Sequence, residues 1–520
     1  MRMLSGPAAR GAGRAGRETA TAVRGLARTA AAAARRHWLL TLLVTVGAGL
    51  RAVTLAGYRP AIFYIDSIKY LLGAYPGNDP PGYELPLKAL LALSNPFAVA
   101  LVQHLLGLGM AIALYVLLLR RHAPRWLAAL ATAPVLLDGY ELQMEHSIMP
   151  DVWFEALLVT ALVVLLWRPR PAPWMLLAGG LALGACAAFR QVGEILALPA
   201  LLYALLAAAP RWRRRLGHAA MLCAGFAVPI LAASFANYLS IGQFALAPYA
   251  ASTIYGRVAE VANCQRLVLP AYVRPLCPSP AQKRLGPDGL DHDLRSPIKT
   301  YVPPAGMHNH NLMLDFARRV VLQQPLSVAA AIGADTLRPF AVHRVTIPGD
   351  TPITRWQFQD AYPQYPPYVT IKHGQVTFAN RTPDGTVQVL GTAARFGGGG
   401  PAVTAPLASF LRSYQLGGGY TPGPLLAFTA VAGLAGSLSL LRRRWLGPPA
   451  REAAVACLLI FASAVVLLLA SDAFEFSWRY QLPSVVTLPP AAALAIAIPL
   501  LRRARSGTGT GPAAPGAPAS

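Results

Sequence analysis

Residues 96–125 read PFAVALVQHLLGLGMAIALYVLLLRRHAPR, an apolar run that ends in a cluster of arginines. A helix needs about 20 mostly apolar residues to cross the roughly 30 Å hydrocarbon core of a bilayer. Residues 96–119 meet that requirement, and Arg120, Arg121 and Arg125 follow immediately. Because the cytoplasmic ends of membrane helices collect basic residues, this stretch predicts a span that leaves the membrane on its cytoplasmic side.

The composition extends this interpretation to the whole chain of 520 residues, of which 55% are hydrophobic and only 13% charged. A typical soluble protein has about a quarter of its residues charged. The formal net charge of +24 would suggest a nucleic-acid partner in a soluble chain. Here the positive-inside rule explains most of that charge, so we expect no nucleic-acid partner and predict a polytopic membrane protein.

Ten segments approach the length and apolarity of membrane helices. They lie near residues 38–57, 96–119, 126–141, 150–167, 173–189, 193–209, 219–236, 423–441, 453–470 and 482–501. Every second span is followed by arginines: Arg120, Arg121 and Arg125; Arg168 and Arg170; Arg211, Arg213, Arg214 and Arg215; Arg442, Arg443, Arg444 and Arg451; Arg502, Arg503 and Arg505. This alternation predicts a multi-pass plasma-membrane protein with both termini in the cytoplasm.

Two terminal segments flank the membrane regions 38–236 and 423–501. Residues 1–37 are rich in arginine, and no small-residue cleavage pattern follows the first apolar run, so we expect a retained cytoplasmic arm. Residues 502–520 are mainly Gly, Pro, Ala, Ser and Thr after the last arginines, which predicts a disordered cytoplasmic tail.

Residues 237–422 separate the seventh and eighth spans and should form an extracytoplasmic α+β domain. The pattern from Asn309 to Phe340 is helical, whereas residues 368–390 alternate like strands, with turn signals at His373-Gly374 and Asp384-Gly385. Cys264 and Cys277 lie in this domain. In an oxidising compartment they predict a disulfide, although two free thiols are the alternative.

Acidic residues gather in two predicted outer loops, residues 58–95 and 138–151. Ionisable groups near the bilayer boundary are costly and are functional candidates by default. A carboxylate held there can take a proton from an acceptor hydroxyl, or hold a divalent cation such as Mg²⁺ or Mn²⁺ against a phosphate. We expect catalysis from Asp66, Glu145 and Asp151, with Asp66 and Asp151 as ligands if a metal binds. The alternative is a set of solvated carboxylates, which would also include Asp79, Glu84, Asp138 and Glu141.

Three arginines break the rule that gathers arginine on the cytoplasmic side. Arg190 lies where the fifth span ends, Arg479 directly precedes the tenth, and Arg51 lies near the outer end of the first. A guanidinium fixed beside a lipid interface can bind a phosphate through two hydrogen bonds. We therefore expect Arg190 and Arg479, with Tyr480 and Lys69, to bind a donor phosphate; snorkelling to lipid headgroups is the alternative.

Neighbouring residues in the two loops are candidates for contact with the rest of the substrate. These candidates are Tyr70, Asp79, Tyr83 and His146. His146 could equally be a metal ligand or a packed or solvated histidine. The sequence has no HExxH zinc pattern, nucleophile elbow, Walker loop or dinucleotide fingerprint.

Short motifs at both ends of the membrane region carry a family resemblance. They are residues 63–70 with Asp66, residues 78–83 with Asp79, residues 145–151, the Phe189-Arg190 pair, and Trp478 to Pro483. In this arrangement the chain resembles the GT-C superfamily of polytopic glycosyltransferases, in an actinobacterial-type membrane protein. The resemblance implies that Asp66 positions or deprotonates the acceptor and that Glu145 or Asp151 assists, sometimes with a divalent cation. Family members often have an adjacent acidic pair where this chain has Asp66-Ser67.

The resemblance implies transfer of a sugar, with inversion, from a polyprenyl-phosphate donor to a hydroxyl of a cell-envelope glycan, lipid or protein. Membrane lipid, the lipid-linked donor and the envelope acceptor would be the partners. A transporter or lipid flippase is one alternative, and a non-catalytic cell-envelope scaffold is another. An enzyme should gather Asp66, the second-loop acids and Arg479 around one cavity, whereas a scaffold could leave them scattered.

Overall fold

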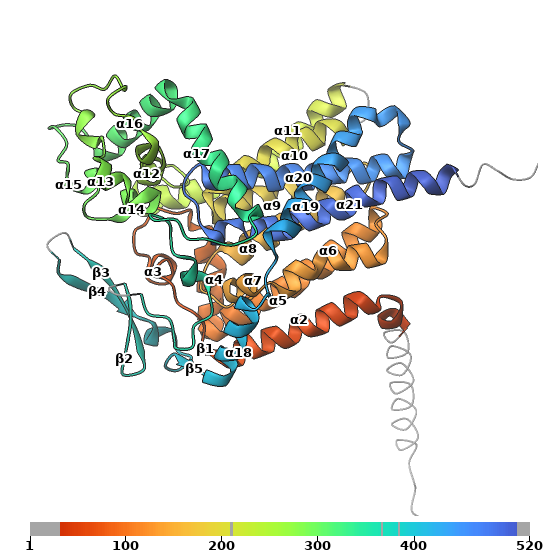
Figure 1. Cartoon of the computed structure of the whole chain (residues 1–520), viewed down its shortest axis with the longest axis horizontal. Coiled ribbons are helices and arrows are strands. Elements are labelled where there is room, and N and C mark those ends of the chain that lie inside the picture. Colours follow the sequence, from red (N-terminus) through yellow and green to blue (C-terminus); the bar gives the residue numbers. More distant parts are fainter. Residues whose placement is uncertain (1–31, 208–211, 366–367, 383–384, 507–520) are drawn as a thin grey trace, which may run out of the picture.

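The computed structural model describes residues 32–207, 212–365, 368–382 and 385–506. A bundle of long helices carries shorter helices and a small sheet at one end (Figure 1). The predicted mainly α, polytopic architecture is confirmed. The predicted arm before residue 32, the tail beyond residue 506, Arg211 and Asp384 lie outside the described residues.

Each of the ten predicted spans corresponds to one helix or to a helix joined to a 3-10 turn. These elements are α2 (Trp38–Gly57), α5 (Pro96–Arg120), α6 (Arg125–Leu137), α8 (Asp151–Leu166), α9 (Pro173–Phe189), η2 (Gln191–Leu196) with α10 (Ala197–Ala207), α11 (Trp212–Ile241), α19 (Gly423–Leu438) with η7 (Ser439–Trp445), α20 (Pro448–Asp472), and η8 (Trp478–Gln481) with α21 (Pro483–Ser506). Among the described residues, six helical segments are long and apolar enough to cross a membrane: α2, α5, α11, α19 with η7, α20, and η8 with α21. The chain is therefore a multi-pass membrane protein, and α6, α9 and η2–α10 are shorter apolar helices of the same bundle.

The third predicted span, residues 126–141, extends too far. α6 ends at Leu137 because Asp138 caps the next helix, α7 (Gly139–Glu145): its Oδ1 accepts a hydrogen bond from the Tyr140 N–H at 2.9 Å. Its Oδ2 accepts another from the Thr421 N–H at 2.7 Å. Asp138 therefore has a capping role, which explains this acid without any part in catalysis.

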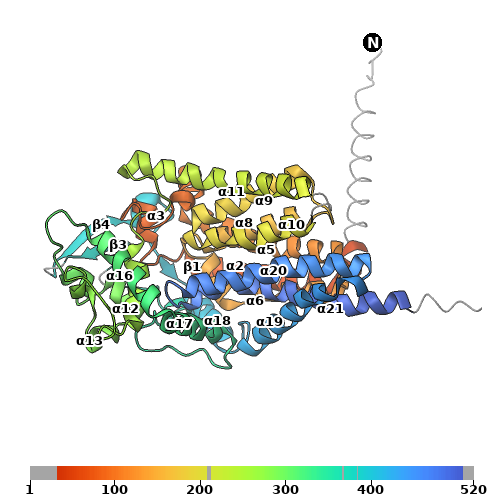
Figure 2. The same ribbon diagram turned by 90° about the horizontal axis from the view of Figure 1, so that it is seen from above.

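α9 and α11 lie side by side along one edge of the bundle (Figure 2). Their backbones approach closely because small residues lie at the contact: a Cβ atom on Gly180 or Gly184 would collide with the backbone of α11. Facing side chains of α5, α6, α8, α9, α10, α20 and α21 form the largest buried core.

The two connecting segments that follow the first and third predicted spans lie at the same end of the bundle. The first connection contains α3 (Ser67–Leu72), η1 (Pro81–Tyr83) and α4 (Glu84–Leu93), and the second contains α7. The Ile62 N–H donates to the His146 carbonyl, and the Ile148 N–H donates to the Ile62 carbonyl, both at 3.0 Å. The two connections are thus joined through their backbones.

The expected α+β segment, residues 237–422, consists of a helical part and a β-rich part, and it begins later than predicted because α11 continues to Ile241. The helical part contains α12 (Ala251–Val261), η3 (Arg274–Leu276), α13 (Pro280–Lys283), α14 (Gly286–His292), α15 (Pro297–Thr300), α16 (Asn309–Gln323), α17 (Pro325–Leu337) and η4 (Arg338–Phe340). It has its own core around Tyr255 and Phe316. The predicted helix 309–340 is broken, and its halves meet at 96° where Pro325 begins α17.

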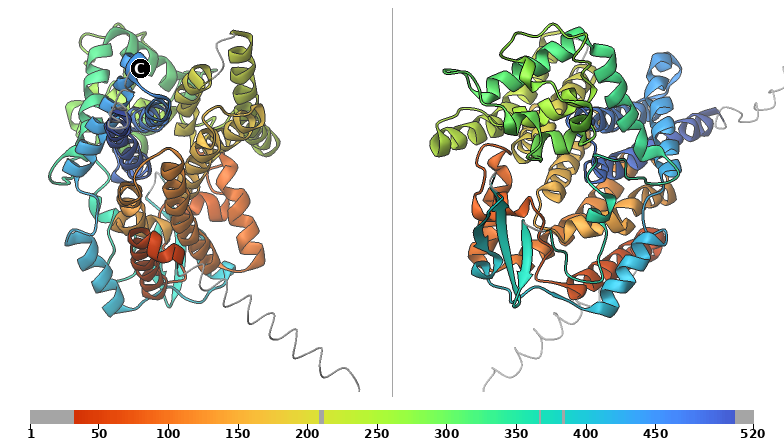
Figure 3. Two further views of the ribbon diagram at one scale, coloured as in Figure 1. Left: turned by 90° about the vertical axis from the view of Figure 1, so that its right-hand side faces the viewer. Right: turned by 60° about the vertical axis from the view of Figure 1, so that its left-hand side comes forward.

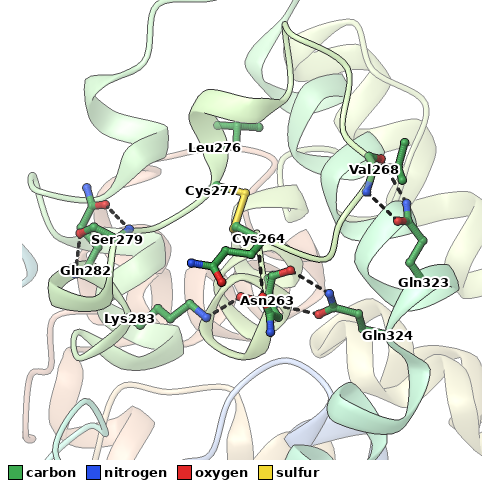
Figure 4. The surroundings of a disulfide bond; sticks show 12 residues. Asn263, Cys264, Val268, Leu276, Cys277, Ser279, Gln282, Lys283, Gln323 and Gln324 are labelled. Carbon is green, nitrogen blue, oxygen red and sulfur yellow. Dashed lines mark hydrogen bonds between the residues drawn. A yellow bond between two sulfur atoms is a disulfide. The ribbon is translucent and has the colours of Figure 1, made fainter.

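Cys264 and Cys277 form a disulfide within the helical part, the pairing expected from the sequence (Figure 4). The adjacent Asn263 N–H donates to Oε1 of Gln324 at 2.8 Å, and the Gln324 amide donates back to the Asn263 carbonyl at 2.9 Å. These bonds attach the disulfide loop to the end of α16.

The β-rich part packs on the first connection (Figure 3). It contains η5 (Ile353–Trp356), β2 (Val369–Lys372), β3 (Gln375–Arg381), β4 (Val387–Thr392), η6 (Ala393–Phe396), β5 (Ala402–Val403) and α18 (Ala405–Leu416). The sheet order is β2-β3-β4, and the β2–β3 turn is the predicted His373-Gly374 pair, with φ values of 50° and 74°. β5 pairs antiparallel with β1 (Tyr58–Arg59), and Phe378 packs edge-on against Phe63 at 5.9 Å.

Candidate active site

Asp66 immediately precedes α3, and the backbone before it is held against the second connection. The Ser67 hydroxyl accepts a hydrogen bond from the Tyr64 N–H at 2.9 Å and donates to the Ile148 carbonyl at 3.0 Å. Ile62, Phe63 and Tyr64 are buried, which fixes the chain up to Asp66. The Asp66 side chain remains 28% exposed, so a substrate can reach it.

Two cations contact the Asp66 carboxylate. Nη1 of Arg479 donates to its Oδ2 at 2.7 Å, and Nζ of Lys69 lies 3.5 Å from its Oδ1. Lys69 also pairs with Asp79 at 2.8 Å. The first predicted loop and the segment before the last span, which are far apart in sequence, therefore meet at one carboxylate.

Asp151 and Arg190 complete the cluster. Asp151 begins α8, Arg190 directly follows α9, and an Arg190 Nη1 hydrogen bond joins their side chains. The Arg479 Nε lies 3.7 Å from the same Asp151 oxygen. Both guanidinium groups lie over the ring of Tyr480, at 4.6 and 4.7 Å. Arg479 therefore lies between two carboxylates that come from different connections.

The arginines retain capacity to bind a ligand. Among the described residues, the buried Nε of Arg479 and Oδ2 of Asp151 have no hydrogen-bond partner. Arg190 donates to Asp151 through one terminal nitrogen, whereas a guanidinium carries five N–H donors in total. Free donors from two arginines beside one another suit a doubly charged phosphate.

A pocket of about 330 Å³ adjoins the cluster between the first connection and the end of α11. Its lining includes Lys69, Tyr70, Asp79, Asn237 and Ser240. Lys69 links this pocket to the cluster because it contacts both Asp79 and Asp66. The predicted substrate-contact residues Tyr70 and Asp79 are thus beside the ion-pair cluster.

The cations determine the protonation of the first-loop residues. Burial would raise the pKa of Asp66, but Lys69 and Arg479 outweigh it and hold that pKa far below the usual range. Burial would lower the pKa of Lys69, but Asp79 and Asp66 raise it well above its usual value. Both groups are therefore fully charged at neutral pH.

Glu145 and His146 are not part of this cluster, which corrects their expected place in the site, and Arg51 lies beside them. They form a buried network in which Arg51 donates to Glu145 and to the Leu136 carbonyl, the latter at 2.9 Å. Glu145 also contacts Nδ1 of His104 at 2.7 Å. Glu145 lies outside the cluster because it belongs to helix α7, which places its side chain inside the bundle against α2 and α5.

His146 belongs to the same network. Its Nε2 donates to the Tyr58 carbonyl at 2.6 Å, and its Nδ1 lies 3.1 Å from Nε2 of His104. His146 is fully buried, so it cannot contact a substrate at the exposed side of Asp66. Its part is to connect α5 and α7 to the end of α2.

This network should be important for stability. We expect Glu145→Ala to destabilise the protein by about 3–5 kcal/mol, because Arg51 and His104 would remain buried without their acceptor. Thermal unfolding of the detergent-purified protein measures the effect. Glu84→Ala is the control: its partner Lys88 is 67% exposed, so we expect at most about 1 kcal/mol. Equal melting temperatures for wild type and Glu145→Ala would contradict this account.

Tyr83 is also a structural residue of the site. It is fully buried, its hydroxyl donates to Oε1 of Gln103 at 3.1 Å, and its ring packs edge-on against Tyr70 at 5.0 Å. Tyr83 therefore packs against Tyr70, which lines the pocket, and does not line the pocket itself.

Sequence reasoning did not identify several charged residues near Asp66. Glu475 lies between α20 and η8, and burial together with the charge of Asp288 raises its pKa. His292 of α14 contributes to the lowered pKa of Asp66. Glu475 lies four residues before Arg479, and this closeness in sequence was the available signal. Nothing in the local pattern of α14 indicates that the charge of His292 acts on Asp66.

A divalent cation does not fit the carboxylates of this cluster. Asp66 and Asp151, the ligands suggested by the sequence, have the Arg479 guanidinium between them, and both are also paired with other cations. In the described ranges, no three His, Cys, Asp or Glu side chains gather in a way that could hold a metal ion. The guanidinium occupies the place that a bridging cation would take.

Comparison with known proteins gives a family match. Residues 66–244 match the model of the dolichyl-phosphate-mannose-protein mannosyltransferases. This family is part of the GT-C superfamily, so the expected GT-C resemblance is confirmed. The match begins at Asp66 and includes Asp151 and Arg190, whereas Arg479 and the segment after residue 244 lie outside it. Neither the curated proteins nor the solved structures give a significant match.

Proposed function

We propose that this membrane protein is a glycosyltransferase, which moves a sugar from a polyprenyl-phosphate donor to a hydroxyl acceptor at the outer face of the plasma membrane. The observation that carries the proposal is the cluster of Asp66, Asp151, Arg190 and Arg479, which combines carboxylates with partly free guanidinium groups. The family match supports the reaction class. A transporter or scaffold would not require these distant residues to meet.

Arg190 and Arg479 are the proposed receptors for the donor phosphate. As the bond between the sugar and the phosphate breaks, negative charge accumulates on the departing phosphate. Preorganised cations that stabilise charge developing in the transition state are often the largest contribution to catalysis. Tyr480 holds both guanidinium groups over its ring and so fixes their orientation.

Asp66 is the proposed carboxylate on the acceptor side. Its exposed edge can accept a hydrogen bond from the acceptor hydroxyl and orient its oxygen toward C1 of the sugar. The new bond forms on the face of C1 opposite the phosphate, so the anomeric configuration inverts. The ionised Asp66 also stabilises the positive charge that develops on the sugar ring.

The pocket beside Lys69 and Asp79 is the proposed place for the sugar. Hydroxyls suit its polar lining, and α11, whose Phe235 and Leu239 are exposed, offers an apolar surface for the prenyl chain at the pocket edge. The arrangement of arginines along the sequence supports cytoplasmic termini, which would place the site on the outer side. A cell-envelope glycan, lipid or protein is the proposed acceptor class.

Metal removal should leave the transfer rate unchanged, because the Arg479 guanidinium takes the bridging position between Asp66 and Asp151. The measurement compares initial rates in vesicles before and after treatment with EDTA. A loss of activity that Mg²⁺ or Mn²⁺ restores would contradict the expectation and return Asp66 and Asp151 to a metal-binding role.

The experiment that tests the function uses the full chain, reconstituted in vesicles with radiolabelled polyprenyl-phosphate mannose and membrane extract as the acceptor source. We expect label to move from the lipid to the acceptor fraction and polyprenyl phosphate to accumulate. A donor series with other sugars identifies the preferred one. No turnover of any polyprenyl-phosphate sugar by the folded protein would overturn the proposal.

A further inference from the structure

Asp472, the last residue of α20, is an acid to which the proposed function gives no part. It is fully buried, and none of the ion pairs among the described residues includes it. A negative charge at the C-terminal end of a helix opposes the helix dipole, and burying a carboxylate without a cation is costly. An ionisable residue at such a position is a functional candidate.

Asp472 connects two elements that are distant in sequence. Its Oδ1 accepts a hydrogen bond from the Gln481 side-chain amide at 3.1 Å, and its Oδ2 lies 3.0 Å from the Thr336 hydroxyl. Thr336 belongs to α17, which lies against α20 (Figure 1), and Gln481 is the last residue of η8. Asp472 therefore joins the turn that carries Arg479 to the outer helical part.

Two arginines that follow α17 contact the segment that leads into η8. The Arg338 guanidinium lies 3.6 Å from the ring centroid of Phe476, and the Arg344 guanidinium lies 5.2 Å from that of Trp478. The two rings pack edge-on against each other at 5.2 Å. Together with the bond to Asp472, these contacts hold the segment before Arg479 from one side.

Arg479 depends on the position of this turn because its guanidinium meets two carboxylates, Asp66 at 2.7 Å and Asp151 at 3.7 Å. We propose that Asp472 is a positioning residue that, through Gln481, holds η8 so that the Arg479 guanidinium faces the donor phosphate. This inference rests on the proposed glycosyl transfer, and it concerns residues outside the region matched by the family model.

The bonds of Asp472 can be removed without leaving their donors unpaired. The Thr336 hydroxyl also lies 2.8 Å from the Ile332 carbonyl, and the Gln481 amide also lies 3.4 Å from the Ser477 carbonyl. Both donors therefore keep an acceptor in Asp472→Leu, which also removes the cost of burying a carboxylate. We expect this variant to unfold at a temperature close to that of the wild type.

The test compares Asp472→Leu and Asp472→Asn in the full chain, reconstituted in vesicles with labelled polyprenyl-phosphate sugar. Asp472→Leu should lower kcat/KM about 10- to 10²-fold, because a misplacement of about 1 Å can cost that much. Asp472→Asn should retain most of the rate: its amide oxygen can accept from Gln481, and its amide nitrogen can donate to the Thr336 oxygen.

A double-mutant cycle distinguishes an effect through Arg479 from a general loss of structure. In the Arg479→Lys background the guanidinium geometry is already lost, so Asp472→Leu should change kcat/KM by no more than about 2-fold. Independent effects would instead multiply.

Asp291→Leu is the matched control. Asp291 is also buried and also accepts a hydrogen bond from a threonine, Thr253, at 2.8 Å, but this pair joins α14 to α12. Its replacement should leave kcat/KM of the folded protein unchanged.

Three results would overturn the role of Asp472: a wild-type kcat/KM in Asp472→Leu, an equal loss in Asp472→Asn, or a loss that multiplies with that of Arg479→Lys. A loss of the same size in Asp291→Leu would also count against it. Each of these results would leave glycosyl transfer by the wild type intact. Absence of transfer by the wild type itself would instead count against the proposed function.

Discussion

Replacing Asp66 by Asn should reduce glycosyl transfer by about 10²- to 10³-fold, the typical cost of removing one preorganised electrostatic group from a transition state. The amide has a similar shape but lacks the charge that stabilises the sugar ring, and it cannot pair with Arg479 and Lys69. Initial rates with labelled polyprenyl-phosphate sugar in vesicles measure the loss.

Asp79→Asn is the matched control for this change. Asp79 lies on the same connection and pairs with Lys69, but it does not contact either arginine of the cluster. We expect a smaller effect, mainly on KM, because Asp79 lines the pocket and not the reacting centre. An Asp66→Asn variant that folds normally and transfers at the wild-type rate would remove Asp66 from the mechanism.

The second large effect should come from Arg479→Lys, with a loss of about 10²-fold in kcat/KM. Lysine keeps the positive charge, but one ammonium cannot reproduce a planar group that contacts Asp66 through Nη1 and Tyr480 through Nη2 while facing Asp151. The same vesicle assay, with kcat and KM determined separately, measures the change.

Arg412→Lys provides the control for loss of a guanidinium. Arg412 belongs to α18 and donates to the Phe358 carbonyl at 2.6 Å, outside the cluster. Its replacement should leave kcat unchanged. If Arg479→Lys behaved like Arg412→Lys, charge alone would explain the role of Arg479, and the proposed bridging geometry would be wrong.

The sequence identified most of the cluster because membrane topology restricts where charges can lie. Asp66 and Arg479 are 413 residues apart, yet each was singled out as an ionisable group at the same predicted face. Arg190 and Arg479 lie on the predicted outer side, against the positive-inside rule, and this exception marked them as functional candidates. The sequence could not show that they meet, because that depends on how α8, α9 and η8 pack.

The errors have local structural causes. Glu145 and His146 lie in the expected loop, but α7 directs them inward, where Arg51 and His104 provide partners. That contact joins α2, α5 and α7, so it is not visible in any one segment of sequence. Glu475 was missed because its raised pKa depends on burial and on the charge of Asp288, which lies on a different element, α14.

The central claim is that the two arginines and Asp66 surround one reacting centre. An experimental structure with a bound polyprenyl-phosphate analogue tests it most directly. We predict that the phosphate contacts Arg190 and Arg479, with the position of the sugar's C1 facing Asp66 and the prenyl chain beside α11. A phosphate bound elsewhere, with Arg190 and Arg479 still paired only to their own carboxylates, would contradict the account.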